Sequence, residues 1–330
     1  MLSRRALFLV ATATPLARPA LAQFPSTRAL RVIVPNPPGG QSDTIARLYG
    51  EAIQATVGQL VVVENRSGAN GLIAMDTVVK APPDGLTTGL FSITLFTTLP
   101  AMMPRMPLDV DRDLTAITSV VTSTVLCCVT EQRARERGWT DFRALLEWAK
   151  RPGNGLTNGA ASSGGASHLL TATLARRSGA DITVVPYRGG APALNDLLAG
   201  NIDMVFDFMP ALLPHVAAGR LRALAVGSAA RVPFLPDVPG MGEFTDLGIG
   251  DLDLQSWNIL SGPPNLPAET AAATVELVRR ANTKPGLEER LRMNGLLSLP
   301  PLDPSAVRAR ITAERPRWRE MVEISGARIE

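Results

Sequence analysis

Histidine and cysteine are scarce in this chain of 330 residues, with two of each. Cys127 and Cys128 are neighbours, and adjacent cysteines do not easily reach the geometry of a disulfide. They lie in the strand-like run 123–130, where alternate side chains point to opposite faces, so we expect two small buried hydrophobic residues, one on each face. A strained vicinal disulfide is the alternative. These histidines and cysteines do not supply a zinc site, and we expect neither a metal nor a cofactor.

Basic runs are absent as well, and aromatic residues make up only 5% of the chain. The first 22 residues carry Arg4, Arg5 and Arg18 and no acidic residue, so their removal leaves 30 of the 33 Lys and Arg residues against 30 Asp and Glu. A balanced charge with few aromatic residues speaks against nucleic acid as a partner.

After the leader, no stretch is apolar for the roughly 20 residues that a membrane span needs. The first 22 residues have the pattern of a signal peptide. Arg4 and Arg5 form a charged start, residues 6–16 are a short apolar stretch, and residues 20–22 (ALA) make a small-x-small cleavage site before Gln23. We therefore expect export to the periplasm. Paired arginines also occur in twin-arginine signals, so the Sec and twin-arginine routes both remain open.

The stretch 32–48 (VIVPNPPGGQSDTIARL) predicts a strand, a tight loop and a helix. Residues 32–35 are apolar, residues 36–41 are rich in proline and glycine, and Ser42 or Asp43 can cap the helix that follows. The unpaired amides and the positive end of such a helix attract an anion.

Gly39 and Gly40 leave the backbone of this loop bare, so a ligand can approach it closely. The loop has neither G-x-G-x-x-G nor G-x-x-x-x-G-K-[ST], so a dinucleotide or triphosphate is not the obvious ligand and a carboxylate fits as well. Glycines that serve turn geometry alone are the alternative. We expect Asp43 to interact with the helix dipole more than with an anionic ligand.

Strands and helices alternate along the rest of the chain, which is typical of α/β folds with parallel sheets. The first unit includes strands at 60–64 and 87–92, and Ser92 lies at the carboxyl edge where such sheets bind ligands. Two short strand-like runs within 114–130 lead into a second unit. That unit repeats the order of strand, glycine loop and helix start at 156–168.

The second unit also contains strands at 182–186 and 203–208, and the apolar strand 221–228 is interpreted as the return to the first unit. Two crossings between the units permit a hinge. The predicted organisation has two lobes: 23–120 plus 225–330, and 121–224.

Four segments carry a family resemblance: VPNPPGGQSDTIAR from Val34, VVVENRSGANG from Val61, PPDG from Pro82 and VPYRGGAPALNDLLAGNIDMVFD from Val185. In this order they resemble the substrate-binding proteins of tripartite tricarboxylate transporters, also called the TctC or Bug (Bordetella uptake gene) family. The resemblance implies an α/β, type II periplasmic-binding-protein fold with two lobes, a hinge and an interlobe cleft. It further implies a small organic acid ligand (a di- or tricarboxylate, an acidic amino acid or an aromatic carboxylate) and a membrane permease as partner. We expect a monomer that performs no chemistry.

In this family the ligand sits between the lobes and is held largely through backbone amides and ordered water. The resemblance therefore places the site on residues 36–43 of the first lobe and on residues 162–168, residues 187–190 and Asp207 of the second. The expected ligand-binding residues are Asn36, Pro38, Gly39, Gly40, Ser42, Asp43, Ser92, Ser162, Ser163, Gly165, Ser167, His168, Tyr187 and Asp207.

Some of these residues have a second interpretation. Ser162, Ser163 and Ser167 could donate to the ligand or only cap a helix and shape the loop. His168 lies at a helix start, where we expect it to be neutral. Asp207 could accept from an amino group, which would favour an amino acid ligand.

Two other classes of protein stay open. Ser163 lies at the centre of 161–165, which weakly resembles the nucleophile elbow of a serine hydrolase, although its first residue is Ala and the partner set is incomplete. A periplasmic sensor or ligand-delivery module without a permease would share the fold and the cleft.

Overall fold

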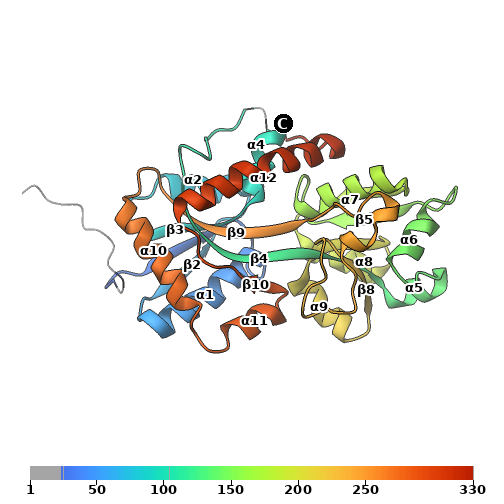
Figure 1. Ribbon diagram of the computed structural model, residues 1–330, viewed down its shortest axis with the longest axis horizontal. Helices are drawn as coiled ribbons and strands as arrows, with labels where there is room; N and C mark the ends of the chain where they lie inside the picture. The colour runs from blue at the N-terminus through green and yellow to red at the C-terminus, as the bar shows by residue number, and fades with distance from the viewer. Residues whose placement is uncertain (1–23, 25, 104, 330) are drawn as a thin grey trace, which may run out of the picture.

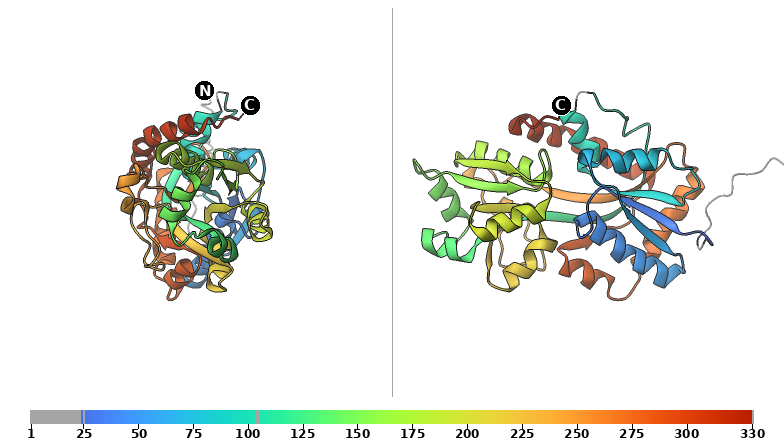
Figure 2. Two further views of the ribbon diagram at one scale, coloured as in Figure 1. Left: turned by 90° about the vertical axis from the view of Figure 1, so that its right-hand side faces the viewer. Right: turned by 180° about the vertical axis from the view of Figure 1, so that it is seen from behind.

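The computed structural model describes residue 24, residues 26–103 and residues 105–329. The expected signal peptide at residues 1–22 lies outside these described residues. Two α/β lobes lie side by side, and two long strands, β4 and β9, run across the waist between them (Figure 1). The view from behind shows helices packed on the sheet of each lobe (Figure 2, right).

The sheet of the first lobe has the strand order β2-β1-β3-β9-β4-β10. Strands β1, β2 and β3 are parallel, whereas β9 runs antiparallel to β3 and β4. The elements of this lobe are β1 (Leu30–Val34), α1 (Gln41–Val57), β2 (Val61–Asn65), η1 (Ala69–Gly71), α2 (Leu72–Val79), β3 (Thr87–Ser92), α3 (Thr94–Thr97), α4 (Leu99–Met102), β9 (Gln255–Gly262), α10 (Ala268–Ala281), α11 (Leu287–Met293), β10 (Leu296–Ser298) and α12 (Pro304–Ser325).

The sheet of the second lobe has the order β6-β5-β7-β4-β8, so β6-β5-β7 repeats β2-β1-β3. Strands β5, β6 and β7 are parallel, and β4 is antiparallel to β7 and β8. The elements from the shared strand onward are β4 (Thr115–Thr130), α5 (Glu131–Arg137), α6 (Phe142–Ala149), β5 (Leu156–Ala160), α7 (Ala166–Ser178), β6 (Ile182–Pro186), α8 (Gly190–Ala199), β7 (Met204–Phe208), α9 (Met209–Ala217), β8 (Leu221–Val226), η2 (Met241–Glu243) and η3 (Thr245–Leu247).

Local sequence explains the elements that carry the candidate site. β1 reads LRVIV and is buried along almost its whole length, as an interior parallel strand must be. α1 ends where Gly58 takes a left-handed conformation with φ +77°, as predicted. β3 and β5 have their predicted bounds: a turn at residues 82–85 lies just before β3, and glycine-containing loops lie on both sides of β5.

Two expectations about the crossings are wrong. Residues 114–130 do not form two short strands: Thr115–Thr130 contains no Gly, Pro, Asn or Asp to interrupt it and forms the single strand β4. One end of β4 pairs with β9, and the other end pairs with β7 and β8. Residues 221–228 are not the return to the first lobe: β8 pairs with β4 residues 126–130, and its apolar side chains pack with α9. β9 makes the return.

Three apolar clusters fill the molecule. One lies between the first sheet and α1, α10 and α11, one lies under α8 and α9 of the second lobe, and the largest passes through both lobes beneath α12. Cys127 belongs to the largest cluster and Cys128 to the cluster under α8, and both thiols are free and buried. Two small buried residues on opposite faces are therefore confirmed. None of the described helices combines the length and the apolarity that a membrane span requires.

Candidate ligand-binding site

The loop between β1 and α1 folds back onto its own helix. α1 begins at Gln41, with Gly40 as its N-cap, and not at Ser42 or Asp43 as expected. The Asp43 carboxylate reaches back over the loop and accepts the amide of Gly39 at 2.9 Å. Gly39 has φ +81°, a conformation that favours glycine and permits this return. Ser42 and Asp43 are consequently buried inside the first turn.

Asp43 accepts three further hydrogen bonds. Arg47 donates twice, at 2.8 and 3.0 Å, and the amide of the Asn65 side chain donates once at 3.0 Å. Burial raises the pKa of Asp43, but its hydrogen bonds outweigh burial and leave the pKa below the ordinary value. Asn65 also donates to the carbonyl of Asn36 at 2.9 Å. The carboxylate therefore shapes the loop and ties it to the end of β2.

Both glycine amides are used inside this loop. The amide of Gly39 donates to the carboxylate just described, and the amide of Gly40 donates to the carbonyl of Pro37 at 3.1 Å. The first amide of α1 with a backbone partner belongs to Thr44. In the described part of the chain, the amides of residues 41–43 have no partner. These amides, and not the glycine amides, are free for a ligand.

The second lobe repeats this loop between β5 and α7. The N-cap Gly165 has φ −73° and ψ 169°, against −72° and 166° for Gly40. Gly164 has φ +68°, and its amide donates to Nδ1 of His168 at 2.9 Å. The amides of residues 166–168 again lack a partner among the described residues. Each lobe thus presents a helix start of this kind, in which a loop glycine is bonded back onto the helix and three amides make no hydrogen bond among the described residues.

The side chains of the second loop differ in exposure. His168 accepts through Nδ1, so its proton is on Nε2, and burial lowers its pKa below the ordinary value. Ser167 is buried, and its hydroxyl is without a partner in the described chain. Ser162 and Ser163, like Pro38 of the first loop, are exposed, and neither serine caps α7. Within the described residues, Ser163 makes no hydrogen bond to a histidine.

A group of hydroxyl side chains extends from the first loop to the waist. Ser92, at the end of β3, lies 3.0 Å from the hydroxyl of Ser256 on β9 and 3.0 Å from that of Thr94. Gln41 donates through its side chain to Ser123 on β4. Gln41 at the start of α1 is thus bonded to β4, and Ser92 is bonded to β9, the two strands that cross the waist. Of these residues the sequence indicated only Ser92.

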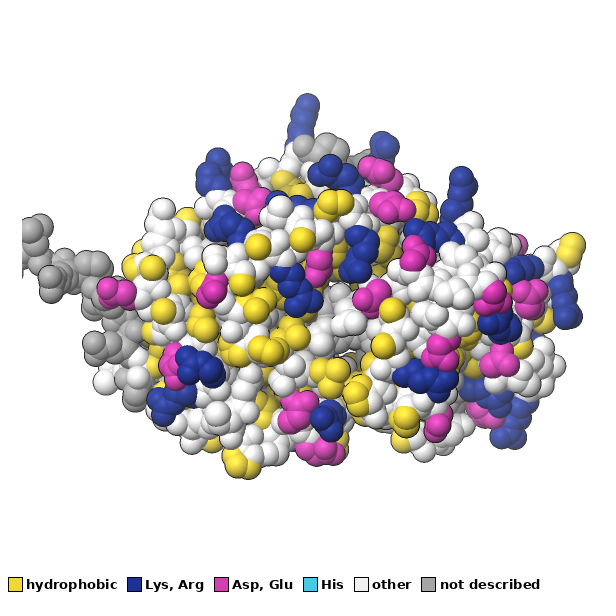
Figure 3. Space-filling model, viewed as in Figure 1, with side chains coloured by type: hydrophobic (Ala, Val, Ile, Leu, Met, Phe, Trp, Pro, Cys, Tyr) yellow, Lys and Arg dark blue, Asp and Glu magenta, His cyan; other side chains and the backbone are white. Residues whose placement is uncertain are grey.

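The lobes touch at two places beside the waist, and in each place a methionine of one lobe packs on a glycine of the other. A Cβ atom added to Gly164 would lie 1.8 Å from Sδ of Met102, so this α4 side chain rests on the second loop. Met209 of α9 rests in the same way on Gly295 of the first lobe. Figure 3 shows a narrow indentation where the lobes meet, with charges of both signs mixed over this face.

The side chains of Tyr187 and Asp207 have partners within the second lobe. The Tyr187 hydroxyl donates to Asp196 at 2.6 Å, and this bond raises the pKa of Tyr187 to about 12. Asp207 accepts the amide of Phe208 at 2.8 Å, and its second oxygen lies against Gly190 at the start of α8. Burial raises the pKa of Asp207 to about 6. Among the described residues, no group of His, Cys, Asp and Glu is placed to hold a metal.

Two sheets of the same strand order, joined across a waist, define a type II periplasmic binding protein, a two-lobed solute-binding class. Residues 45–325 match the tripartite tricarboxylate transporter family receptor (TctC) family, and the chain belongs to this family. BugT of Bordetella pertussis (strain Tohama I) is 32% identical over 317 residues, which cover 96% of this chain and 94% of BugT. A UPF0065 protein in the tcbD-tcbE intergenic region of Pseudomonas sp. (strain P51) is 33% identical over 305 residues, 91% of this chain and 86% of that protein.

Solved structures agree with this assignment. The periplasmic binding protein BugD is 28% identical, with a TM-score of 0.81 over 92% of this chain and 100% of BugD. R. palustris Rpa4515 with adipate is 29% identical, with a TM-score of 0.82 over 92% and 99%. MatC from Rhodopseudomonas palustris with bound malate is 28% identical, with a TM-score of 0.78 over 91% and 100%. The family consists of solute-binding proteins, so the chain is not an enzyme and the serine hydrolase alternative is set aside.

Proposed function

We propose that this protein captures a small dicarboxylate between its lobes, with one carboxylate on the free amides of each loop. The observation that carries the proposal is the repeat of one loop: α1 and α7 both start with three free amides behind a glycine that is bonded back onto the helix. A carboxylate accepts from such amides and gains from the positive end of the helix. The adipate of Rpa4515 and the malate of MatC support this class of ligand.

Asp207 favours a dicarboxylate over an amino acid. A ligand amino group would need a free acceptor in the second lobe. One oxygen of Asp207 already accepts the amide of Phe208, and the other is packed against Gly190. The carboxylate is also buried, which disfavours its charged form. It therefore offers little to an ammonium group.

We place the mature protein in the periplasm, exported by the signal pattern of residues 1–22, as a monomer that delivers its ligand to a permease of the tripartite tricarboxylate type. A free-standing sensor or delivery module would share the site. Growth on the identified ligand separates the transporter component from the free-standing module. Deletion of the gene for this protein should abolish uptake, as deletion of the permease does, only if the protein serves that permease.

Calorimetry and thermal shift on the chain from residue 23 test the ligand class. Adipate, malate and succinate are compared with acetate and with aspartate. A ligand at one hundred times its dissociation constant adds about 2.7 kcal/mol to the free energy of unfolding, which a thermal shift detects. We expect a dicarboxylate to shift the melting temperature and the monocarboxylate to have no effect. A shift with neutral compounds alone would contradict the proposal.

Ala166→Pro tests the free amides themselves. Proline at the first position of a helix lacks only an amide that has no helical partner, and Gly165 before it already has the extended conformation that a following proline requires. Loss of one hydrogen bond to a charged group is worth about 1.5–3 kcal/mol, so we expect the affinity for the dicarboxylate to fall by roughly 10-fold or more. Ala268→Pro, at the exposed first position of α10, is the matched control. Equal affinity in Ala166→Pro and the control would contradict the binding mode.

A further inference from the structure

α12 contacts both lobes: its first half lies on the first lobe, and its second half lies on the second lobe. Arg315 pairs with Asp111 at 2.7 Å and donates to the carbonyl of Phe96 at 3.3 Å, both in the first lobe. Trp318, Met321 and Val322 are buried one to two turns further along the helix. The ribbon shows α12 running obliquely over the junction between the lobes (Figure 1).

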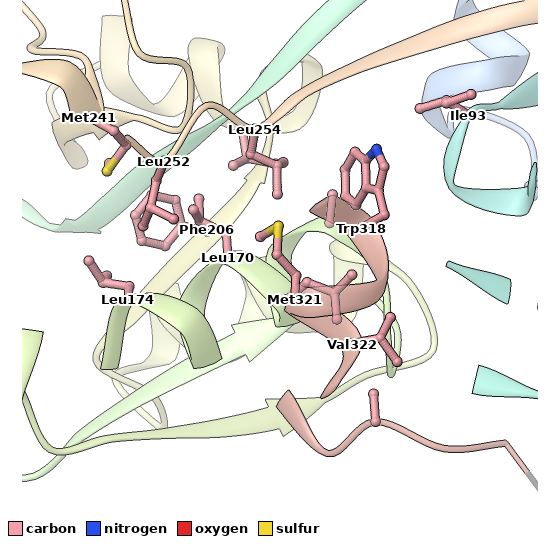
Figure 4. Close-up of a cluster of buried hydrophobic side chains, with 14 of the residues drawn as sticks. Ile93, Leu170, Leu174, Phe206, Met241, Leu252, Leu254, Trp318, Met321 and Val322 are labelled. Carbon is pink, nitrogen blue, oxygen red and sulfur yellow. The ribbon is translucent and has the colours of Figure 1, made fainter. Parts of the chain in front are cut away.

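The second half of α12 packs into the core of the second lobe. Met321 and Val322 project from α12 among side chains of the second lobe, with Leu170 and Leu174 on α7 and Phe206 on β7 in the same cluster (Figure 4). Outside this cluster, Arg177 on α7 pairs with Glu320 on α12 at 3.3 Å. α12 therefore supplies core residues to the second lobe, although the chain from α10 onward belongs to the first lobe.

A partly buried acid, Glu314, fixes α12 at the crossing. The carboxylate of Glu314 accepts the indole NH of Trp257 on β9 at 3.1 Å and that of Trp318 at 3.3 Å. Trp257 pairs with Thr122 of β4, so both waist strands lie at this point. Arg310 completes the group, 2.9 Å from Glu314. The helix is thus attached to the axis about which the lobes would move.

Pro316 lies between Arg315, which pairs with Asp111 of the first lobe, and Met321, which packs beside Leu170 of the second (Figure 4). A proline inside a helix cannot donate to the carbonyl four residues earlier, here that of Thr312, and its ring crowds that carbonyl. Kinks in helices concentrate at such positions. After α12 ends, Ile329 returns to the first lobe through one hydrogen bond to the carbonyl of Met102 at 3.1 Å.

We propose that α12 is a third connection between the lobes and that it bends at Pro316 when they move, its second half travelling with the second lobe. The inference rests on the proposed function in one respect: ligand capture between the lobes would use this movement of one lobe relative to the other. A helix that stayed rigid on the first lobe would instead require α7 to slide over Met321 and Val322.

Spin-label distances in the ligand-free protein test the bend. Labels are placed at Lys80→Cys in the first lobe and Arg151→Cys in the second, both exposed positions, while Cys127 and Cys128 are fully buried and stay unlabelled. Pro316→Ala restores the missing helix bond, so we expect a narrower distribution of interlobe distances. Pro304→Ala, at the first position of α12, is the control and keeps the parental distribution. A single narrow distance in the parent, or no narrowing in Pro316→Ala, would overturn the proposal.

Hydrogen exchange tests the attachment of α12 to the second lobe. In Val322→Ala, or in Trp318→Ala if it folds, we expect the amides of α7 to exchange at least about tenfold faster, while those of α1 keep their protection. Unchanged α7 amides would show that α12 belongs to the first lobe alone. No ligand is added in either experiment, so failure of the dicarboxylate assignment would leave both results interpretable.

Discussion

His168 accepts the amide of Gly164 at 2.9 Å, just as Asp43 in the other lobe accepts the amide of Gly39 at 2.9 Å. Each acceptor is the third residue of its helix, and each donor is a glycine at positive φ four residues earlier. The two lobes therefore close the same loop with different chemistry. An imidazole loses its acceptor lone pair on protonation in mild acid, whereas a carboxylate keeps its charge there.

We expect mild acid to destabilise the protein through His168. Burial lowers its pKa below the ordinary value of 6.5, so near that pH the unfolded chain binds the proton more readily than the folded chain. The contribution to stability is complete above pH 6.5 and is lost as the pH falls through the lower folded pKa. Urea unfolding between pH 7.5 and about 5 should therefore show a smaller decline in His168→Asp than in the parent.

His215 serves as the control for this measurement. Burial, aided by Arg220, lowers its pKa as well, so part of the decline in mild acid belongs to this residue. In His215→Asn we expect the component from His168 to persist. An equal decline in His168→Asp and the parent would show that the bond to Gly164 contributes nothing to the acid response.

Replacement of Asp207 by Asn should stabilise the folded protein at neutral pH. Burial raises the pKa of Asp207 from 3.8 to about 6, so the folded state binds the proton more tightly than the unfolded state. Protonated Asp207 therefore contributes to the free energy of unfolding in acid, and this contribution is lost as the pH rises through about 6. Two pKa units correspond to about 3 kcal/mol, and Asn keeps the acceptor for Phe208, so we expect a gain of about 1–3 kcal/mol at pH 7.5.

Asp203, which precedes the same strand, should show the opposite effect on replacement by Asn and serves as the comparison. Its carboxylate pairs with Arg133 at 2.7 Å and accepts the amide and hydroxyl of Thr157, both at 2.8 Å. Asp203→Asn should therefore lower the free energy of unfolding in the same urea titration. A loss of stability in both variants at pH 7.5 would mean that the Asp207 carboxylate has a partner that stabilises its charge.

Alanine at the two loop glycines should separate backbone strain from contact between the lobes. Both positions have positive φ, so Gly39→Ala and Gly164→Ala share a strain cost of about 1 kcal/mol. A Cβ at Gly39 meets nothing within 4 Å, whereas one at Gly164 overlaps Met102. We expect Gly164→Ala to lose more stability, and Met102→Ala to recover part of the difference in the double variant. Equal losses would indicate that Met102 moves freely.

Much of the fold follows from local pattern, but the helix starts do not. β3 and β5 have their predicted bounds because a turn before β3 and glycine-containing loops on both sides of β5 delimit them. Capping rules pointed to Ser42 or Asp43, since a short polar side chain before an apolar stretch normally accepts from its own first turn. Here Asp43 accepts from the loop before the helix, so the helix begins at Gln41.

Other parts of the candidate site depend on contacts that no local pattern contains. Gln41 and Ser123 are 82 positions apart, and Ser92 and Ser256 are 164 positions apart, so their hydrogen bonds exist only through the register of β4 and β9. Tyr187 was placed at the ligand by resemblance, yet its hydroxyl is engaged by Asp196 on the following helix. The hydrogen-bond partners of these side chains come from tertiary packing, which neither a local pattern nor a family resemblance contains.

Cys127 and Cys128 report on the strand that joins the lobes. Both are fully buried, and burial raises the pKa of both thiols, which suppresses the reactive thiolate. β4 is paired with other strands along both of its edges around these residues, so reagent reaches them only when the strand opens. We expect no reaction with a water-soluble disulfide reagent at about pH 8 in the native protein, and two thiols per chain after unfolding. Lys80→Cys, exposed on the first lobe, should react at once under the same conditions. Fast reaction of the native cysteines would mean that β4 opens locally, and movement at the waist would then involve broken strand pairing instead of rotation about intact strands.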